Sequence, residues 1–546
     1  MTEPTESSLP APEFDPRSWL TALARGLWLW LPTLCFLGLG GWLLGLFAFD
    51  PGAANLAALN PKSDYWEHAG VLRELISHPF APQNPHLAMG LPSPRYMPLF
   101  VAIALVARAC SMDAIAAMAL TGAVNVAVLL VGIFCFFRVY FQDHRAPLYG
   151  LVTMLCSYYL GFNFSNVLQL RMLLEVAAYP STAAVGFTLV TLAIAVRALR
   201  GRWSWLWLVL LLLSATNVML THPLTAMMMY SGIGVLALVE PEVTWRRRVL
   251  VLVALACSVP LAEAWPYFSV IRTMLGGHDF DESWVAAGAQ KLASGETQRK
   301  RHRFYQLLPL ARTIGFAGIG AYGLAAMLFA RRHLFLVFGA ALVLAPFVLN
   351  TFVKVPLGHR YVLYFIYYMQ FALVWMLLKA TPGFHEGWWV LFGGKWRKVV
   401  AVTVVYGLLG TMLAMNVPDM QRRIERARDR SSKAVTLCRE VAEVAGEDTI
   451  VLAPPITSWV LPACGTKVVA TIHHNPLLAD SRARTRRLKK VFSKRATLSE
   501  IDDIVEEEEV THVVVRGRPK GAMRQFLRKR HSDGEPITAG FRIYTL

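Results

Sequence analysis

Charged residues are scarce in this sequence. Only 16% of the 546 residues are Asp, Glu, Lys or Arg, whereas 55% are apolar; a typical soluble protein carries about 25% charged residues. The mean hydropathy is +0.43. Apolar runs of about 17–25 residues, long enough to cross a bilayer as helices, recur along most of the chain. A soluble globular protein is therefore excluded, and we expect an α-helical polytopic membrane protein.

Acidic residues are fewer than basic ones, 36 against 54, which gives a net charge of +18. Such an excess can indicate nucleic-acid binding. Here, however, the basic residues gather in short loops between apolar runs, and such loops mark the cytoplasmic face. We therefore expect membrane lipids as the counter-charge and no nucleic-acid partner. These loops contain Arg197, Arg200 and Arg202, then Arg246, Arg247 and Arg248, then Arg331 and Arg332, then Lys395, Arg397 and Lys398.

Cysteines are few and scattered. Seven occur, none of them in a CxxC or other metal-like spacing. Only Cys438 and Cys464 share a polar segment; they could pair if that segment lies outside the cytoplasm, but the sequence does not favour a disulfide. The first apolar run, Trp28 to Phe49, also lacks a small-residue cleavage site, so we expect it to remain as a membrane span.

The apolar runs predict about 12–13 membrane spans after a disordered cytoplasmic tail of residues 1–25. Polar loops 50–95 and 271–307 are expected outside. The basic residues at 138–145 look cytoplasmic and do not fit this scheme, so we expect one more weak span or half-helix between 97 and 178, for a total of thirteen. The predicted spans are 26–48, 97–110, 114–137, 146–162, 178–196, 204–220, 223–240, 249–268, 308–330, 334–352, 359–379 and 399–416.

The composition changes after the last span. Short apolar runs in "DTIVLAPP", "TKVVAT", "THVVVRG" and "FRIYTL" are typical of buried strands. Segments with a charged face between them, such as "LSEIDDIVEEE", are typical of helices. Residues 26–416 are thus predicted to form the membrane domain, and residues 417–546 a small soluble α/β domain on the outer face.

The first outer loop carries an unusual group of polar residues in "DYWEH". If a helix begins here, Asp64 and His68 are four residues apart on one face, with Glu67 beside them. A carboxylate paired with an imidazole can take a proton from a hydroxyl or hold a divalent metal ion. The alternative is structural, because Asp64 and Glu67 also have the spacing of a capping box at a helix start.

Four other segments place ionisable residues near predicted span ends. Arginine can clamp a phosphate and tyrosine can orient it, although the same residues can simply anchor a helix at the interface. An Arg and a Glu four residues apart can also form an ion pair within one helix. The candidates are Arg95 and Tyr96 in "GLPSPRYMPLF", Arg171 and Glu175 in "LRMLLEVAAYP", His222 in "THP", and His359 and Arg360 in "GHRY".

These acids and cations map mostly to one membrane face, which suggests transfer from a lipid-phosphate donor. Their order along the chain resembles the GT-C superfamily of polytopic glycosyltransferases. More narrowly, "DYWEH", "GLPSPRYMPLF", "LRMLLEVAAYP" and "APPITSWVLPACGTKVVATIHHNP" resemble bacterial membrane proteins labelled 6-pyruvoyl-tetrahydropterin-synthase-related. We infer no pterin chemistry from that label.

The resemblance implies an inverting glycosyltransferase of the bacterial inner membrane that uses a polyprenyl-phosphate sugar on the periplasmic face. The acceptor would be a glycan, a lipid or a protein. Asp64 would be the general base, with Glu67 and His68 as helpers. A magnesium or manganese ion bound by these three residues is optional, because arginines can neutralise a monophosphate without it. The remaining roles would be phosphate binding by Arg95, Arg171 and Arg360, and contacts to the cavity or acceptor by His222, His473 and His474.

Three other functions are compatible with the sequence. A transporter or flippase for a lipid-linked saccharide would also hold charges inside a bundle, but such proteins often show two similar halves, and no internal repeat is evident here. A polysaccharide polymerase or ligase would share the lipid donor but normally lacks an α/β tail. In a non-catalytic assembly protein, the acids would only cap helices.

Overall fold

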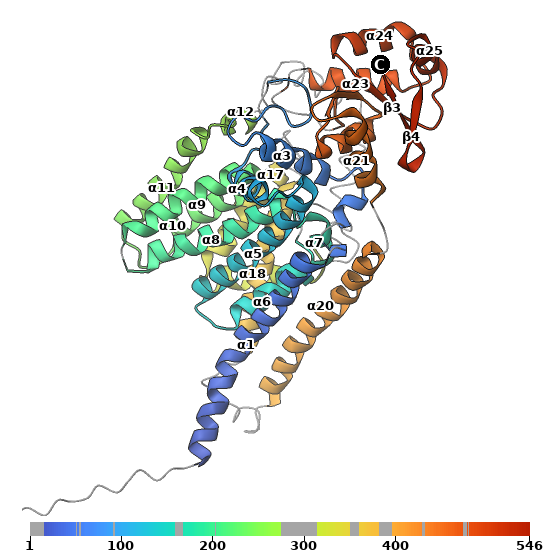
Figure 1. Cartoon of the computed structure of the whole chain (residues 1–546). Helices are drawn as coiled ribbons and strands as arrows, with labels where there is room; N and C mark the ends of the chain where they lie inside the picture. The colour runs from blue at the N-terminus through green and yellow to red at the C-terminus, as the bar shows by residue number, and fades with distance from the viewer. Residues whose placement is uncertain are drawn as a thin grey trace, which may run out of the picture.

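The computed structural model describes residues 16–50, 52–53, 56–90, 93–158, 168–202, 204–274, 314–349, 360–381, 396–428, 432–472, 478 and 480–546. In this part of the chain, a bundle of apolar helices carries a small domain with a mixed β-sheet at one end (Figure 1). The expected fold class is confirmed: the chain is a multi-pass α-helical membrane protein with a small C-terminal α/β domain.

Helices of two lengths build the bundle. Among the helices of the described residues, five are long and apolar enough to cross a membrane. These lie in α1 (Pro16–Phe49), α5 (Ala114–Phe141), α8 (Pro180–Arg200), α18 (Tyr361–Ala380) and α20 (Trp396–Arg428). The shorter helices are α4 (Pro98–Ala109), α6 (Ala146–Cys156), α7 (Leu170–Val176), α9 (Trp205–Thr221), α10 (Pro223–Val239), α11 (Trp245–Glu263), α12 (Val270–Met274), η3 (Gly315–Gly318), α16 (Ile319–Phe329) and α17 (Leu334–Leu349).

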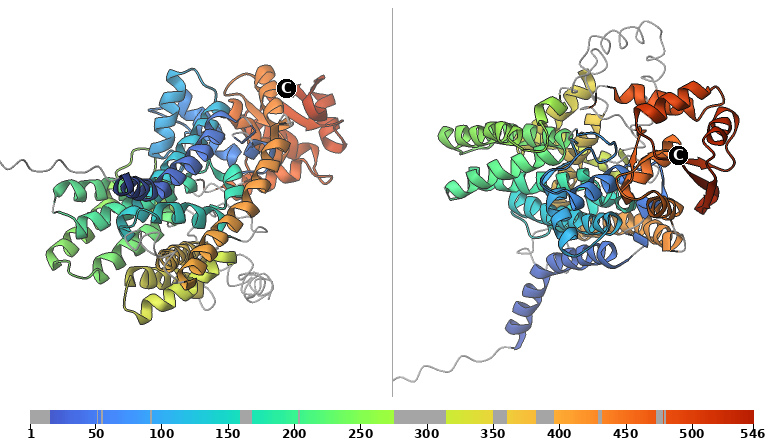
Figure 2. Two further views of the ribbon diagram at one scale, coloured as in Figure 1. Left: turned by 90° about the horizontal axis from the view of Figure 1, so that it is seen from below. Right: turned by 45° about the horizontal axis from the view of Figure 1, so that its top comes forward.

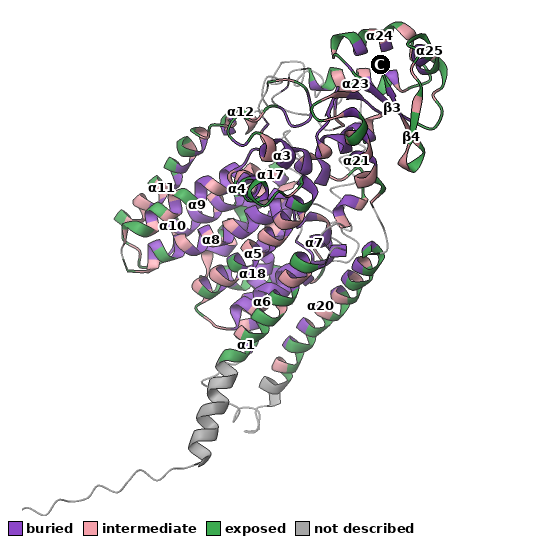
Figure 3. Ribbon diagram, in the orientation of Figure 1, coloured by how far each residue is buried: buried purple, intermediate pink, exposed green. Residues whose placement is uncertain are grey.

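The centre of the bundle is packed backbone to backbone. A Cβ added to Gly132 of α5 would lie 2.3 Å from the carbonyl oxygen of Gly186 in α8, so only glycine allows this approach. Burial is concentrated in this centre, whereas α1 and α20 turn apolar side chains outward (Figure 3). Trp30 is 63% exposed and Val404 is 61% exposed. Such surfaces are stable only against lipid, as expected for outer helices of a membrane bundle.

Helix α4 does not cross the bundle, although a span was predicted at 97–110. Just before α4, the hydroxyl of Tyr96 donates a hydrogen bond to the loop that follows α3 (Tyr65–Ser77). In the last turn of α4, Arg108 donates to carbonyl oxygens at the end of α3. Asp113, immediately before α5, pairs with Arg439 of the C-terminal domain at 2.8 Å. Both ends of α4 therefore lie at the same end of the bundle.

The basic loops gather at the opposite end. Arg200 pairs with Glu240 and donates a 3.0 Å hydrogen bond to the carbonyl of Tyr140. Arg247 donates to the carbonyl of Gly201, and the ring of His333 lies 3.1 Å from the Tyr140 hydroxyl. Because α4 begins and ends at the same end of the bundle, α5 alone carries the chain to the opposite end. The basic residues at 138–145, which follow α5, therefore lie with the other basic loops, and no additional span before them is needed.

Removing α4 from the twelve predicted spans leaves eleven, an odd number. Accordingly, the first residues of α1 and the C-terminal domain lie at opposite ends of the bundle (Figures 1 and 2). A short helix at one end of the bundle thus stands where one of the spans was predicted. The total number of spans and the side on which each end of the chain lies stay predictions.

The C-terminal domain contains a five-stranded sheet with strand order β2-β1-β3-β5-β4. Strand β1 pairs in parallel with β2 and β3, whereas β5 pairs antiparallel with β3 and β4. Strand β4 was not predicted, because its "GEPI" sequence contains glycine and proline. The strands are β1 (Ile450–Leu452), β2 (Lys467–Val468), β3 (His512–Arg516), β4 (Gly534–Ile537) and β5 (Phe541–Thr545). The helical segments are α21 (Lys433–Ala445), α22 (Pro455–Val460), η6 (Leu461–Cys464), α23 (Ser481–Val491), α24 (Leu498–Glu507), α25 (Gly521–Lys529) and η7 (Thr538–Gly540).

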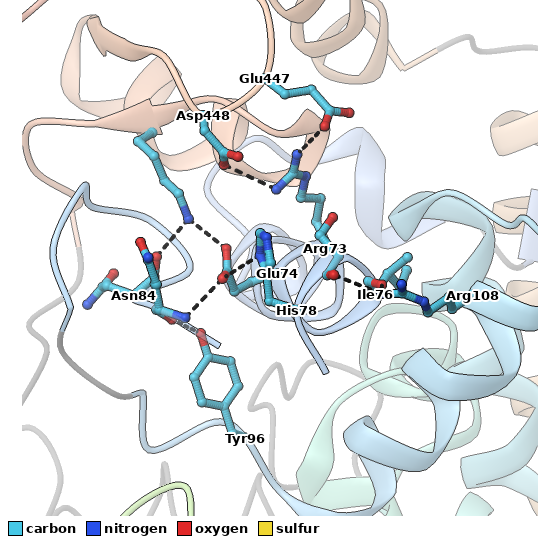
Figure 4. Close-up of polar contacts among 12 residues, drawn as sticks. Arg73, Glu74, Ile76, His78, Asn84, Tyr96, Arg108, Glu447 and Asp448 are labelled. Atoms are coloured by element: carbon cyan, nitrogen blue, oxygen red, sulfur yellow. Dashed lines mark hydrogen bonds and ion pairs between the residues drawn. The ribbon is translucent and has the colours of Figure 1, made fainter. Parts of the chain in front are cut away.

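Helix α3 of the first outer loop packs directly on this domain (Figure 4). Arg73 pairs with Glu447 at 2.8 Å and with Asp448 at 3.3 Å. The next residue, Glu74, accepts from the Lys467 ammonium at 2.7 Å, and both side chains are almost fully buried. These contacts fix the position of α3 relative to the C-terminal domain.

A disulfide joins Cys438 of α21 to Cys464 at the end of η6. The sequence did not favour this pair, because cysteines 26 residues apart give no indication that their helices meet. The bond ties η6 to α21, and η6 in turn packs against α3. Gly465 follows with φ +109°, and a Cβ there would lie 2.9 Å from the Arg73 guanidinium, so glycine is required at this close approach.

Candidate active site

Asp64 stands at the start of α3, in the N-cap position, but its side chain makes no capping hydrogen bond. The serine before it takes that role, because the Ser63 hydroxyl accepts a hydrogen bond from the Tyr65 N–H at 3.1 Å. Two tryptophans fix this corner: Trp66 donates to the Asn60 carbonyl, and Trp459 of the C-terminal domain donates to the Ser63 carbonyl. The capping-box interpretation is therefore wrong, and the half-buried Asp64 carboxylate is held on a rigid corner.

Glu67 also does not cap the helix, since it forms an ion pair with Arg95. The Arg95 Nε lies 3.0 Å from Oε1, and Nη2 lies 3.5 Å from Oε2. Burial raises the pKa of the Glu67 carboxyl, but the charges of Arg95, His68 and His86 outweigh it and lower the pKa to about 2. Glu67 is thus an anion at neutral pH that orients Arg95.

His68 is buried against aromatic rings. It is only 4% exposed, and its ring meets the edges of Phe100 and Tyr179 at centroid distances of 5.6 and 5.3 Å. The Tyr179 hydroxyl lies 2.6 Å from the Ser63 hydroxyl, so this aromatic group backs the corner that carries Asp64. The position of His68 fits a supporting role better than direct contact with a substrate.

His222 caps α10 and faces the same group of charges. Its Nδ1 accepts a hydrogen bond from the Thr225 N–H at 3.2 Å, which leaves the proton of the neutral ring on Nε2. Burial, with the nearby charges of Arg95, Arg360 and His68, lowers the pKa of His222 to about 3. These electrostatic contacts show that residues from α3, the loop before α4, the α9–α10 turn and the start of α18 converge.

Arg360 supplies a donor to this cluster. It occupies the N-cap position of α18, and its Nε is buried with no hydrogen-bond partner among the described residues. A buried guanidinium donor without a partner is costly, unless a ligand accepts from it. Of the predicted site residues, Asp64, Glu67, His68, Arg95, His222 and Arg360 therefore lie in one region.

Arg171 and Glu175 belong to a different cluster. They do not form the intrahelical pair that their spacing suggested, because each pairs with α20 instead. Glu175 accepts from Arg423 at 2.8 Å, and Arg171 lies 3.9 Å from Asp419. The cluster joins α7 to the end of α20, so in the described structure Arg171 binds α20 and not the group around Arg95.

The remaining predicted residues are either internal or outside the described part of the chain. Tyr96 is fully buried, and its hydroxyl donates to the Gln83 carbonyl, so it holds the loop that follows α3 (Figure 4). His359, His473 and His474 lie outside the described residues. Among the residues that are described, no group of three or more His, Cys, Asp or Glu side chains could hold a metal ion, so Asp64, Glu67 and His68 do not form a three-ligand site.

A pocket with a volume of about 110 Å³ opens beside the Glu67–Arg95 pair. It lies between the first outer loop, the α9–α10 turn and the C-terminal domain. The sequence analysis missed most of its lining, because these residues come from distant segments and carry no motif of their own. The lining includes Asn84, His86, Thr221, Trp459 and Arg484.

The half-buried, neutral state of His222 predicts a pH effect on stability. The unfolded chain binds a proton near pH 6.5 and the folded chain only near pH 3, so the free energy of unfolding falls as the pH drops through this window. At pH 5 the loss is about 2 kcal/mol. The His222→Asn variant keeps an N-cap acceptor, so its melting temperature should depend less on pH between 7 and 5. Equal pH slopes for the two proteins would contradict the assignment.

Comparison with known proteins gives a match in structure only. Neither a protein-family model nor a curated protein sequence matches the chain. Two structures of the Archaeoglobus fulgidus oligosaccharyltransferase are similar. The one tethered by a disulfide bond to an acceptor peptide containing the NVT sequon has a TM-score of 0.50 at 12% identity, and the match covers 87% of this chain and 69% of that one. The complex with Zn and sulfate has a TM-score of 0.49 at 14% identity, with 86% and 67% covered.

The first of these likenesses concerns the fold. It covers 87% of this chain, and it supports the resemblance to the GT-C superfamily at the level of the fold. The narrower resemblance to the 6-pyruvoyl-tetrahydropterin-synthase-related proteins is not confirmed. The chain therefore shares its fold with this oligosaccharyltransferase.

Proposed function

We propose that this protein is a membrane glycosyltransferase that moves a sugar from a polyprenyl-phosphate donor to an acceptor hydroxyl. The observation that carries the proposal is the convergence of one half-buried carboxylate, Asp64, with the cations Arg95 and Arg360 at one end of a membrane bundle. Transfer from a lipid phosphate needs a base and a phosphate clamp at the membrane surface. The GT-C fold is consistent with this chemistry.

The proposed reaction is a single displacement with inversion. The acceptor oxygen bonds to the anomeric carbon as the bond from that carbon to the phosphate oxygen breaks, with its electron pair leaving on the polyprenyl phosphate. Asp64 takes the proton of the acceptor hydroxyl. Arg95, held by Glu67, and Arg360, with its unpaired Nε, stabilise the charge on the phosphate. His222 stays neutral and packs beside them. No step requires a metal ion.

Two observations favour the outer face of the bacterial inner membrane. The basic loops lie at the end of the bundle opposite the site, and such loops mark the cytoplasmic side. The Cys438–Cys464 disulfide lies at the site's end, and disulfides persist in oxidising compartments such as the periplasm. The site and the C-terminal domain would then be periplasmic.

A deletion strain tests the proposal. Loss of the gene should remove one glycan product and leave its lipid-linked sugar donor accumulated on the outer leaflet, where a membrane-impermeant glycosidase can cleave it. Expression of the wild-type protein should restore the product. Accumulation on the inner leaflet, protected from the glycosidase, would instead support the flippase function, and an unchanged glycan and lipid profile would reject both.

A further inference from the structure

We propose that the pocket beside Glu67 and Arg95 is the acceptor site and that it takes a saccharide ring, so that the acceptor is a glycan. This inference rests on the proposed glycosyl transfer, and it chooses among the glycan, lipid and protein acceptors that the sequence leaves open. Three features of the pocket carry it: polar groups without a partner among the described residues, balanced charge, and an apolar part of the lining.

The first unpaired group is the side-chain amide of Asn84. Its Oδ1 accepts from the N–H groups of His86 and Leu87, each at 3.0 Å, and this fixes the orientation of the amide. Nδ2 is therefore a donor, and it has no hydrogen-bond partner among the described residues although Asn84 is only 1% exposed. The Lys467 ammonium holds the same loop through the Asn84 carbonyl at 2.9 Å, so the donor is rigidly placed.

The second is the hydroxyl of Thr221, the last residue of α9. Thr221 is 4% exposed, and its Oγ1 also lacks a hydrogen-bond partner in the described part of the chain. A hydroxyl can both donate and accept. A buried polar group without a partner destabilises the fold, so two of them, in residues that line one pocket, indicate a ligand with several hydrogen-bonding groups.

The charges in the pocket are balanced. Arg95 is paired with Glu67, and Arg484 is paired with Asp480 and Glu508. An anionic acceptor would have to compete for Arg95 with the donor phosphate, which the proposed function assigns to it, and for Arg484 with Asp480 and Glu508. A neutral ligand with hydroxyl groups can instead share them, since both carboxylates and guanidinium N–H groups retain free hydrogen-bonding positions.

The apolar part of the lining comes from Leu87, Pro94, Phe268 and Leu478. Beside them, the rings of His86 and Trp459 stack on each other, with centroids 5.7 Å apart and an interplanar angle of 8°, and are only 8% and 1% exposed. A saccharide has one face of C–H groups, which packs on apolar side chains, and a rim of hydroxyls. The pocket volume of about 110 Å³ suits one ring-sized group, whereas an extended peptide or an acyl chain needs a long groove.

Binding measurements on the purified full-length protein in nanodiscs test the inference without turnover. The probes are methyl glucoside, methyl mannoside and N-acetylglucosamine, compared with a blocked Asn-Val-Thr peptide and with inorganic phosphate, by saturation-transfer NMR. At least one saccharide should bind saturably. Asn84→Asp keeps the acceptor for the two N–H groups but removes the donor, and Thr221→Val removes the hydroxyl at equal volume. Each should weaken saccharide binding about 3–10-fold.

Matched controls should leave binding unchanged. Asn60→Asp alters an exposed asparagine that accepts from a nearby N–H in the same loop, and Thr188→Val removes a buried, unpartnered hydroxyl inside α8. The inference is overturned if no saccharide binds, if the pocket variants bind saccharide as well as the controls do, or if the peptide or phosphate is the probe that the variants lose. Donor consumption is scored separately: wild-type protein that binds saccharide but consumes no donor contradicts the proposed transfer, not the pocket.

Discussion

Replacing Asp64 with asparagine is expected to lower the rate of sugar transfer by about 10²–10⁴-fold, the usual contribution of a positioned general base. Asparagine has the same shape but accepts no proton at neutral pH. The corner around Asp64 is held by Ser63, Trp66 and Trp459 rather than by the Asp64 side chain, so the helix start should survive the change. The rate is measured in vesicles with the lipid-linked sugar that accumulates in the deletion strain, and KM for this donor should change little.

Asp113→Asn is the matched control for this substitution. Asp113 is also an aspartate at a helix start, beside the C-terminal domain, where its Oδ1 accepts from the Ala116 N–H at 2.8 Å. Asparagine caps helices as well as aspartate does, and only the exposed pair with Arg439 is lost. This control should retain nearly full activity. Wild-type rates for Asp64→Asn would remove Asp64 from the mechanism and favour the transport or assembly functions.

The sequence predicted the long spans well because each is a continuous apolar run that satisfies its own backbone. It wrongly predicted that α4 crosses the membrane, although the length of that apolar run already argues against a crossing. A 14-residue helix at 97–110 reaches only about 21 Å, short of the roughly 30 Å of a bilayer core. The direction of α4 depends on Arg108 and Asp113, whose partners lie in other segments. Hydropathy alone cannot report such contacts.

The candidate site was partly predictable for a similar reason. Asp64, Glu67 and His68 lie in one local motif, so their proximity follows from helix geometry. Arg171 and Glu175 have the spacing of a helical pair, yet both bind α20, because interhelical partners compete with local ones. The pocket residues Asn84 and Thr221 carry no sequence signal. They become candidates only through their burial and their missing partners, which are properties of the folded chain.

The buried pair between Lys467 and Glu74 should be the most sensitive contact between the C-terminal domain and α3. Their side chains are 6% and 2% exposed, and the contact is 2.7 Å. Removing one partner of a buried pair leaves an uncompensated charge, so Lys467→Met is expected to lower the free energy of unfolding by about 3–5 kcal/mol. The measurement is denaturant unfolding of the full-length protein in detergent, followed by tryptophan fluorescence.

Arg487→Met provides the comparison, because Arg487 pairs with Glu507 at the surface, where the side chains are 42% and 58% exposed. That change should cost at most about 1 kcal/mol. The double variant Lys467→Met with Glu74→Met removes both charges and should recover much of the lost stability, since an apolar pair can replace a buried ion pair. Glu74 shares α3 with Asp64, and Lys467 holds the Asn84 loop. Transfer activity should therefore fall in the single variant and recover with the double. If stability recovers but activity does not, the ammonium itself is needed to position the Asn84 loop.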